Sequence, residues 1–111
     1  MTMRAKFRVK KDTWWLLRDI LDNDQEFNTD RQSLRGRKIS HPTEISNGLL
    51  DFDLRKIDGV DYVIYSYATP IAWRHHGKWS LNEQRYSVTT SFHQGRVSAA
   101  VADLKGALGA A

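Results

Sequence analysis

The stretch from Tyr62 to Gln94 constrains this chain more than any other, because its β-branched and aromatic residues are concentrated there. Such residues fit the pleated, half-buried surface of a β-sheet. Val60 to Tyr67 is an almost continuous apolar and aromatic run, which predicts a strand buried on both faces. Because proline cannot donate to a sheet ladder, Thr69-Pro70 predicts a bulge or kink before the strand continues to Trp73.

The rest of this stretch predicts a hairpin and one more strand. Residues 74–78 read Arg-His-His-Gly-Lys between two tryptophans, which predicts a loop with Gly77 at a positive φ. Trp73 and Trp79 would then be near-opposite neighbours across the two strands. Apolar and polar residues alternate from Arg85 to Ser91, and this period of two predicts a further strand.

The flanking segments supply helices and short strands. Strict alternation over residues 4–10 predicts an edge strand with Lys and Arg facing outward. Residues 22–33 are polar and turn-rich, which predicts a loop anchored by Phe27. Apolar residues at helical spacing predict three helices, from Asp12 or Thr13 to about Asn23, from Leu49 to Ile57, and from Gln94 to Leu108.

Together these elements predict an α+β fold. We expect an antiparallel sheet of about four to five strands, with the N-terminal and C-terminal helices packed on one face. A chain of 111 residues has room for one core, so residues 1–111 are expected to form a single domain.

Several classes of site are disfavoured by composition. The chain has no cysteine, which excludes disulfides, thiolate metal sites and cysteine nucleophiles. His75 and His76 are adjacent on a hairpin and point to opposite sides, so we expect no metal site and no cofactor. No apolar run has signal-peptide or membrane-spanning character. These features predict a soluble cytoplasmic protein that does not bind membranes.

The charge is mildly basic and unevenly distributed. The net charge is +4, with ten Lys or Arg against six Asp or Glu in residues 1–40 and five against two in residues 62–111. Residues 41–61 are acidic, with two basic residues against five acidic ones. Basic ends around an acidic middle are compatible with a polyanionic ligand, with a self-complementary homodimer, or simply with solubility.

The best candidate site is the junction at Thr89, Thr90, Ser91, His93 and Arg96. Ser91 followed by Gln94 is a capping-box pattern, so the hydroxyl run is expected to meet a helix N-terminus that would suit an anion. The alternative is structural, with Ser91 only capping the helix, Thr90 and Phe92 packing, and His93 in solvent. No orienting acid or oxyanion hole can be identified, so we assign no catalytic residue.

Three further residues are weaker binding candidates. Arg35-Gly36-Arg37 matches the tripeptide with which extended basic arms enter the A·T minor groove. The alternative is a short strand with a bulge at Gly36 and its arginines in water. Trp15 falls on the polar side of the first helix, where a loop covers it or a partner binds it.

Two blocks in the centre of the chain resemble a known family. YSYATPIAW over residues 65–73 and YSVTTSFHQ over residues 86–94, with a second Trp between them, are similar to small uncharacterised proteins of actinobacteriophages, including mycobacteriophages, and of actinobacterial genomes. The resemblance does not extend to the N-terminal helix or to Arg35-Gly36-Arg37. It implies a phage or actinobacterial origin and expression in the bacterial cytoplasm, but it supplies no activity.

Three functions remain open at this stage. The first is a non-enzymatic phage accessory protein that binds a host macromolecule, either a host protein or nucleic acid. The second is a small metal-independent hydrolase or nuclease at the Thr89–Arg96 junction, with Tyr65 or Tyr67, His93 as general acid or base and Arg96 on phosphate. The third is a self-assembling structural protein that associates through its alanine-rich C-terminal helix.

Overall fold

The computed structural model describes residues 6–9, 16–29, 33–102 and 104. In chain order the elements are β1 (Lys6–Val9), α1 (Leu16–Asp22), β2 (Glu26–Thr29), β3 (Leu34–Lys38), the 3-10 turns η1 (Pro42–Glu44) and η2 (Leu54–Lys56), β4 (Val60–Ser66), β5 (Thr69–His75), β6 (Lys78–Leu81) and α2 (Val88–Ala102). The expected cap of the first helix and Trp15 lie outside the described residues, and so does the end of the last helix.

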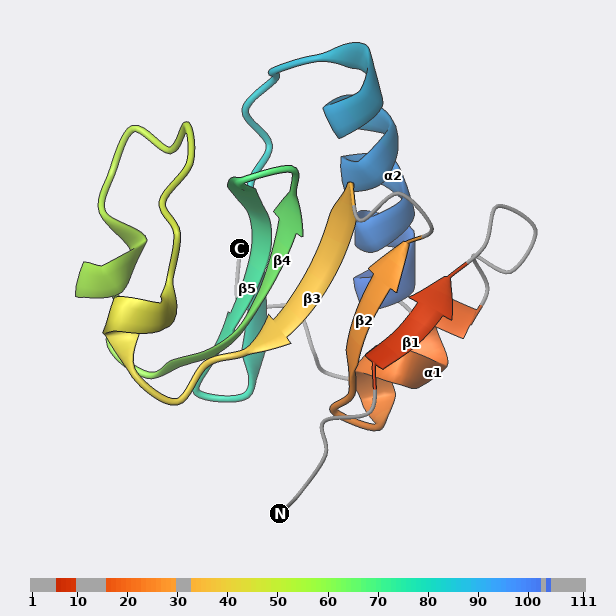
Figure 1. Cartoon of the computed structure of the whole chain (residues 1–111), viewed down its shortest axis with the longest axis horizontal. Helices are drawn as coiled ribbons and strands as arrows, with labels where there is room; N and C mark the ends of the chain where they lie inside the picture. The colour runs from red at the N-terminus through yellow and green to blue at the C-terminus, as the bar shows by residue number, and fades with distance from the viewer. Residues whose placement is uncertain (1–5, 10–15, 30–32, 103, 105–111) are drawn as a thin grey trace.

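The strands form one sheet in chain order, β1-β2-β3-β4-β5-β6. Strands β2 to β6 are antiparallel neighbours, and α1 and α2 lie together on one side of them (Figure 1). The predicted α+β fold is therefore confirmed. Strand β1 adds a sixth strand, parallel to β2, and α1 lies in the crossover that such a parallel pair requires.

Two cores lie on opposite faces of the sheet. On the helix side, Leu17 and Ile20 of α1 and Val97 and Val101 of α2 pack on buried sheet residues. On the other side, residues 39–59 cover a smaller core (Figure 1) that contains Ile45, Leu54, Val63, Tyr65 and Trp73. Because β4 is sandwiched, Tyr62 and Ile64 face the helices while Val63 and Tyr65 face the cover, as its apolar run predicts.

Strands β4 and β5 form a hairpin, so the prediction of one strand continuing past Pro70 is wrong. The chain reverses at Tyr67-Ala68, and Ser66 pairs with Thr69. The predicted irregularity is nevertheless present. The register steps from Ile64 opposite Ala72 to Tyr65 opposite Pro70, which leaves Ile71 as a bulge.

The second hairpin turns at His76-Gly77, which is shorter than the loop predicted over residues 74–78. Gly77 has the expected positive φ, +74°, but the expected tryptophan pair is absent. Trp79 pairs with Arg74 and Trp73 pairs with Ser80, so the two indoles lie on opposite faces of the sheet. Trp79 packs edge-on against Tyr62 at 5.5 Å between ring centroids, whereas Trp73 lies under the cover.

The loop predicted over residues 22–33 is wrong in its middle, because Glu26–Thr29 is a strand and Phe27 is fully buried. The bulge predicted at Gly36 is also wrong, since β3 pairs in unbroken register with β4. Gly36 is required there for another reason. A Cβ at this position would overlap the Phe27 ring and the Tyr62 hydroxyl.

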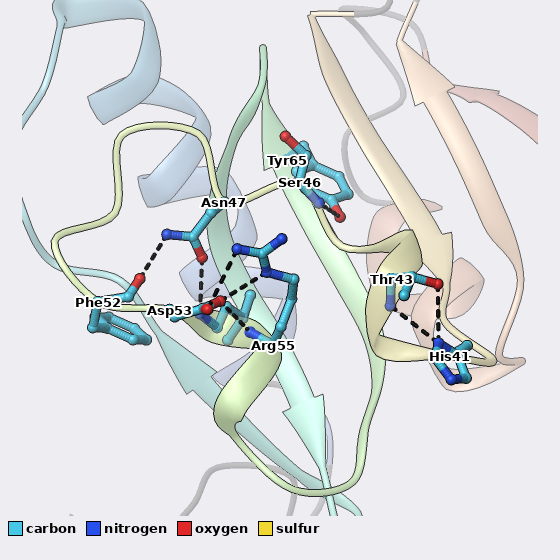
Figure 2. A network of polar contacts seen from close by, with 9 residues as sticks. His41, Thr43, Ser46, Asn47, Phe52, Asp53, Arg55 and Tyr65 are labelled. Atoms are coloured by element: carbon cyan, nitrogen blue, oxygen red, sulfur yellow. Dashed lines mark hydrogen bonds and ion pairs between the residues drawn. The ribbon is translucent and has the colours of Figure 1, made fainter.

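The helix predicted over Leu49–Ile57 is wrong, and only η2 forms there. Asn47 holds this segment, because its amide donates to the carbonyl of Phe52 (2.6 Å) and its side-chain oxygen accepts from the backbone N–H of Leu54 (2.8 Å) (Figure 2). Asp53 then caps η2 by accepting from the N–H of Arg55. Side-chain bonds to the backbone thus replace the helical ladder.

Candidate functional site

Helix α2 begins at Val88 rather than at Gln94, so the strand predicted from Arg85 to Ser91 is wrong. The capping residue is Ser87, whose Oγ accepts from the backbone N–H of Thr90 at 3.1 Å. Ser91, the predicted cap, instead donates its N–H to the Ser87 carbonyl at 2.9 Å, in the first helical bond. The predicted helix N-terminus therefore lies close to the hydroxyl run but begins more than one turn too late.

A buried polar cluster joins this first turn to the end of β4. Ser66 Oγ lies 2.8 Å from His93 Nδ1 and donates to Thr90 Oγ1 at 3.1 Å, and Ser87 Oγ donates to the same Thr90 oxygen. Since a hydroxyl has a single proton, His93 Nδ1 donates to Ser66. Only 1% of Ser66 and 4% of His93 is exposed, so the interpretation that places His93 in solvent is wrong. Burial also lowers the pKa of His93 and favours its neutral form.

The Ser66–His93 distance is that of a nucleophile and its base. A reacting carbonyl or phosphoryl group would have to touch Ser66 Oγ, however, and that side chain is buried between β3, β5 and α2. The cluster in this conformation therefore fixes the position of α2 on the sheet and does not present a nucleophile to solvent.

Two exposed aromatic rings flank the buried imidazole. Tyr67, in the β4–β5 turn, is 54% exposed, and Phe92, on α2, is 48% exposed. The centroid of each ring lies 6.2 Å from that of His93. Exposed apolar patches often mark sites where a ligand or a partner binds.

An arginine accompanies each ring. The Arg96 guanidinium lies over Phe92, 5.0 Å from its centroid. Arg35 donates from Nη2 to the Tyr67 carbonyl at 3.1 Å and lies 5.5 Å from the Tyr65 ring centroid. The contacts run from Arg35 to Tyr67, through His93 to Phe92, and on to Arg96. We call Arg35, Tyr67, Phe92 and Arg96 the aromatic–arginine surface.

The other predicted site residues lie outside the aromatic–arginine surface. Arg37 is held against β2, where it donates to the Phe27 and Gly36 carbonyls at 2.8 Å and to the Asn28 side chain. Thr90 is buried in the polar cluster, and Thr89 is exposed on the first turn of α2. Ser91 lines a different hollow of about 270 Å³, between α2 and residues 82–85. Trp15 lies outside the described residues.

From the sequence, Tyr67 was named only as a side chain of the alternative hydrolase site, and Phe92 was not named as a binding residue. Tyr67 has a φ of +55°, which is unusual for a residue with a side chain, and no Gly or Asn in this turn signals it. Phe92 was assigned to packing because the chain alternates around it. Only the α2 start at Val88 brings Phe92 and Arg96 onto one helix face, four residues apart.

The structure offers neither a clustered metal site nor a membrane span in its described part. Within residues 6–9, 16–29, 33–102 and 104, no three His, Asp or Glu side chains gather as metal ligands. Over the same residues, neither helix combines the length and the apolar character needed to cross a bilayer.

Comparison with family models gives a match over residues 16–106, to a family whose function is unknown. Comparison with curated proteins and with solved structures gives no match. The match includes every residue of the aromatic–arginine surface and of the buried polar cluster.

Proposed function

We propose that this chain, which belongs to the family of unknown function DUF8033, is a non-enzymatic module that binds nucleic acid. The observation that carries this proposal is the alternation of exposed rings and arginines at one end of the sheet. Arginine supplies both charge and planar stacking to phosphate-bearing ligands. The alternative hydrolase has less support, because His93, its proposed general acid or base, is buried.

The charge distribution supports a polyanionic ligand. No Asp or Glu occurs between Gln84 and Ala102, so the visible part of α2 carries Arg96 as its single charged residue. Along β4 the first carboxylate before Tyr67 is Asp61, about 20 Å away at ~3.3 Å per strand residue. Asp61 is also engaged by Arg74 at 2.8 Å. Along α2 and β4, a phosphate at the aromatic–arginine surface would therefore meet Arg96 and no carboxylate closer than Asp61.

We further propose that the protein acts in the cytoplasm of an actinobacterium, as a phage or phage-derived accessory protein. The YSYATPIAW and YSVTTSFHQ blocks support that origin, and the lack of cysteine suits a reducing compartment. The self-assembly hypothesis has less support, because the stripe formed by Val97, Ala100 and Val101 is buried against the helix-side core. A host protein remains the competing ligand.

A salt titration tests the nucleic-acid proposal. Binding of fluorescein-labelled DNA and RNA would be followed by fluorescence anisotropy from ~50 mM salt upward, and log K should fall linearly with log salt by about 0.7–0.9 for each phosphate contacted. Arg96→Gln should weaken binding and reduce the slope by about one such step. The control is Lys56→Gln, a loss of the same charge on the exposed turn η2.

Absence of binding to every nucleic acid at ~50 mM salt would refute the proposal. A pull-down from host lysate, with and without nuclease, then addresses the competing ligand. Partners that survive nuclease treatment and are lost from the Arg96→Gln variant would assign the surface to a host protein.

A further inference from the structure

We infer that the ligand is an unpaired nucleic-acid strand whose bases stack on Tyr67 and Phe92. This inference rests on the proposed function and narrows it to one class of ligand. Proteins that bind single strands combine a positively charged path with aromatic side chains on which successive bases stack. In a duplex those base faces are already stacked on one another, so exposed rings gain nothing from it.

The backbone that carries Tyr67 is fixed while its ring remains available. The Tyr67 N–H donates to the Ser33 carbonyl at 2.7 Å, and its own carbonyl accepts from Arg35. The phenol hydroxyl makes no hydrogen bond within the described residues, and about half of the side chain is exposed. A ring held in place before binding loses little conformational entropy when a base stacks on it.

The second ring lies within reach of the same strand. Each ring centroid is 6.2 Å from that of His93, so Tyr67 and Phe92 are at most about 12 Å apart. Ser66 holds the His93 side chain, and this bond keeps α2 next to the end of β4. Arg96 beside Phe92 and Arg35 beside Tyr67 are then placed for the phosphates between or next to the stacked bases.

The same part of the molecule is poorly suited to a duplex. Proteins that read duplex DNA place a helix or a two-stranded ribbon in the major groove and contact phosphates on both sides. Over Val88–Ala102, α2 carries one charged residue, and its apolar face is packed on the sheet. A duplex would gain few phosphate contacts there, whereas a flexible strand can follow the surface around the sheet end.

The test compares affinities for a short oligothymidine, the matching oligouridine, and a duplex hairpin of the same length at ~50 mM salt. The unpaired strands should bind at least about tenfold tighter than the hairpin. Tyr67→Leu and Phe92→Leu should each weaken strand binding about 5- to 150-fold, the equivalent of losing one stacked base. The DNA and RNA arms identify which sugar the surface prefers.

Phe52→Leu is the matched control, because Phe52 is also a half-exposed ring but packs on Trp73 under the cover. It should leave the affinity unchanged, and circular dichroism would verify that all three variants fold. Equal or tighter binding of the hairpin overturns the inference, as does full affinity in both Leu variants, while nucleic-acid binding itself stands. If no oligonucleotide binds at all, the proposed function itself is refuted.

Discussion

Gly36 offers a quantitative test of how tightly β2, β3 and β4 are packed. A Cβ at this position would overlap the Phe27 ring and the Tyr62 hydroxyl, both of which are fully buried. Burial raises the pKa of Tyr62, and the phenol stays protonated and donates to the Gln25 carbonyl at 2.5 Å. A methyl group here would therefore strain the core and threaten a buried hydrogen bond together.

The expected cost of Gly36→Ala follows from these two effects. Overpacking of a core costs about 1–3 kcal/mol, and a buried polar group that loses its partner costs about 1–3 kcal/mol. We expect the free energy of unfolding to fall by about 2–6 kcal/mol, measured by urea denaturation with an unchanged m-value. That is a large part of the stability of a typical domain, about 5–15 kcal/mol.

Gly95→Ala is the matched control. Gly95 is inside α2, and a Cβ there would meet nothing within 4 Å. Because glycine is a poor helix former, this change should raise stability by about 0.5–1 kcal/mol. A Gly36→Ala variant within about 0.5 kcal/mol of the wild type would refute the argument, because Phe27 and Tyr62 could then move aside freely.

Three further predictions concern the buried cluster and the cover. Ser66→Ala should lower the free energy of unfolding by about 1–3 kcal/mol in urea denaturation, because it leaves His93 without its acceptor. As a control, Ser91→Ala at an exposed position should change it by less than about 0.5 kcal/mol. Equal effects of the two changes would contradict this role for the cluster. Stability should fall as the pH drops below about 6.5, by at most ~1.4 kcal/mol per unit, because burial lowers the pKa of His93 and the unfolded chain then binds a proton that the folded chain does not. His93→Gln should remove this part of the slope in denaturation curves at several pH values, and an unchanged slope would argue against it. Asn47→Ala should speed proteolytic cleavage within residues 46–53, since it removes bonds to Phe52 and Leu54, and unchanged cleavage would show that the cover does not depend on them.

Local patterns predicted the elements whose burial is regular along the chain. The run from Val60 to Tyr67 predicts β4, because apolar residues occupy most positions of a strand that is buried on both faces. Strand β2 was missed because Phe27 lies among polar residues and its burial depends on neighbours distant in sequence. Propensity is a weak guide where such tertiary contacts decide.

The start of α2 was missed for a related reason. Tyr86, Val88, Thr90 and Phe92 alternate with polar residues and are mostly β-branched or aromatic, which favours a strand. The Ser87 cap and the burial of Thr90 and His93 against Ser66 override that preference. Sequence patterns nevertheless identified His93, Thr90, Arg96 and Arg35, which the structure brings to one end of the sheet. Their aromatic companion Tyr67 depends on a turn that no local signal marks.

Because the strands pair in chain order, a segment between two strands can be lengthened without changing any strand pairing. Each strand pairs with its neighbour in sequence, so residues 39–59 close a loop between β3 and β4 without contributing a strand themselves. Doubling the length of such a loop costs only about 0.6 kcal/mol of closure entropy. Asp51 is exposed in this loop, and a foreign peptide or fluorophore tag can therefore be grafted there. Such a graft leaves all strand pairings in place and reports on ligand binding from outside the aromatic–arginine surface.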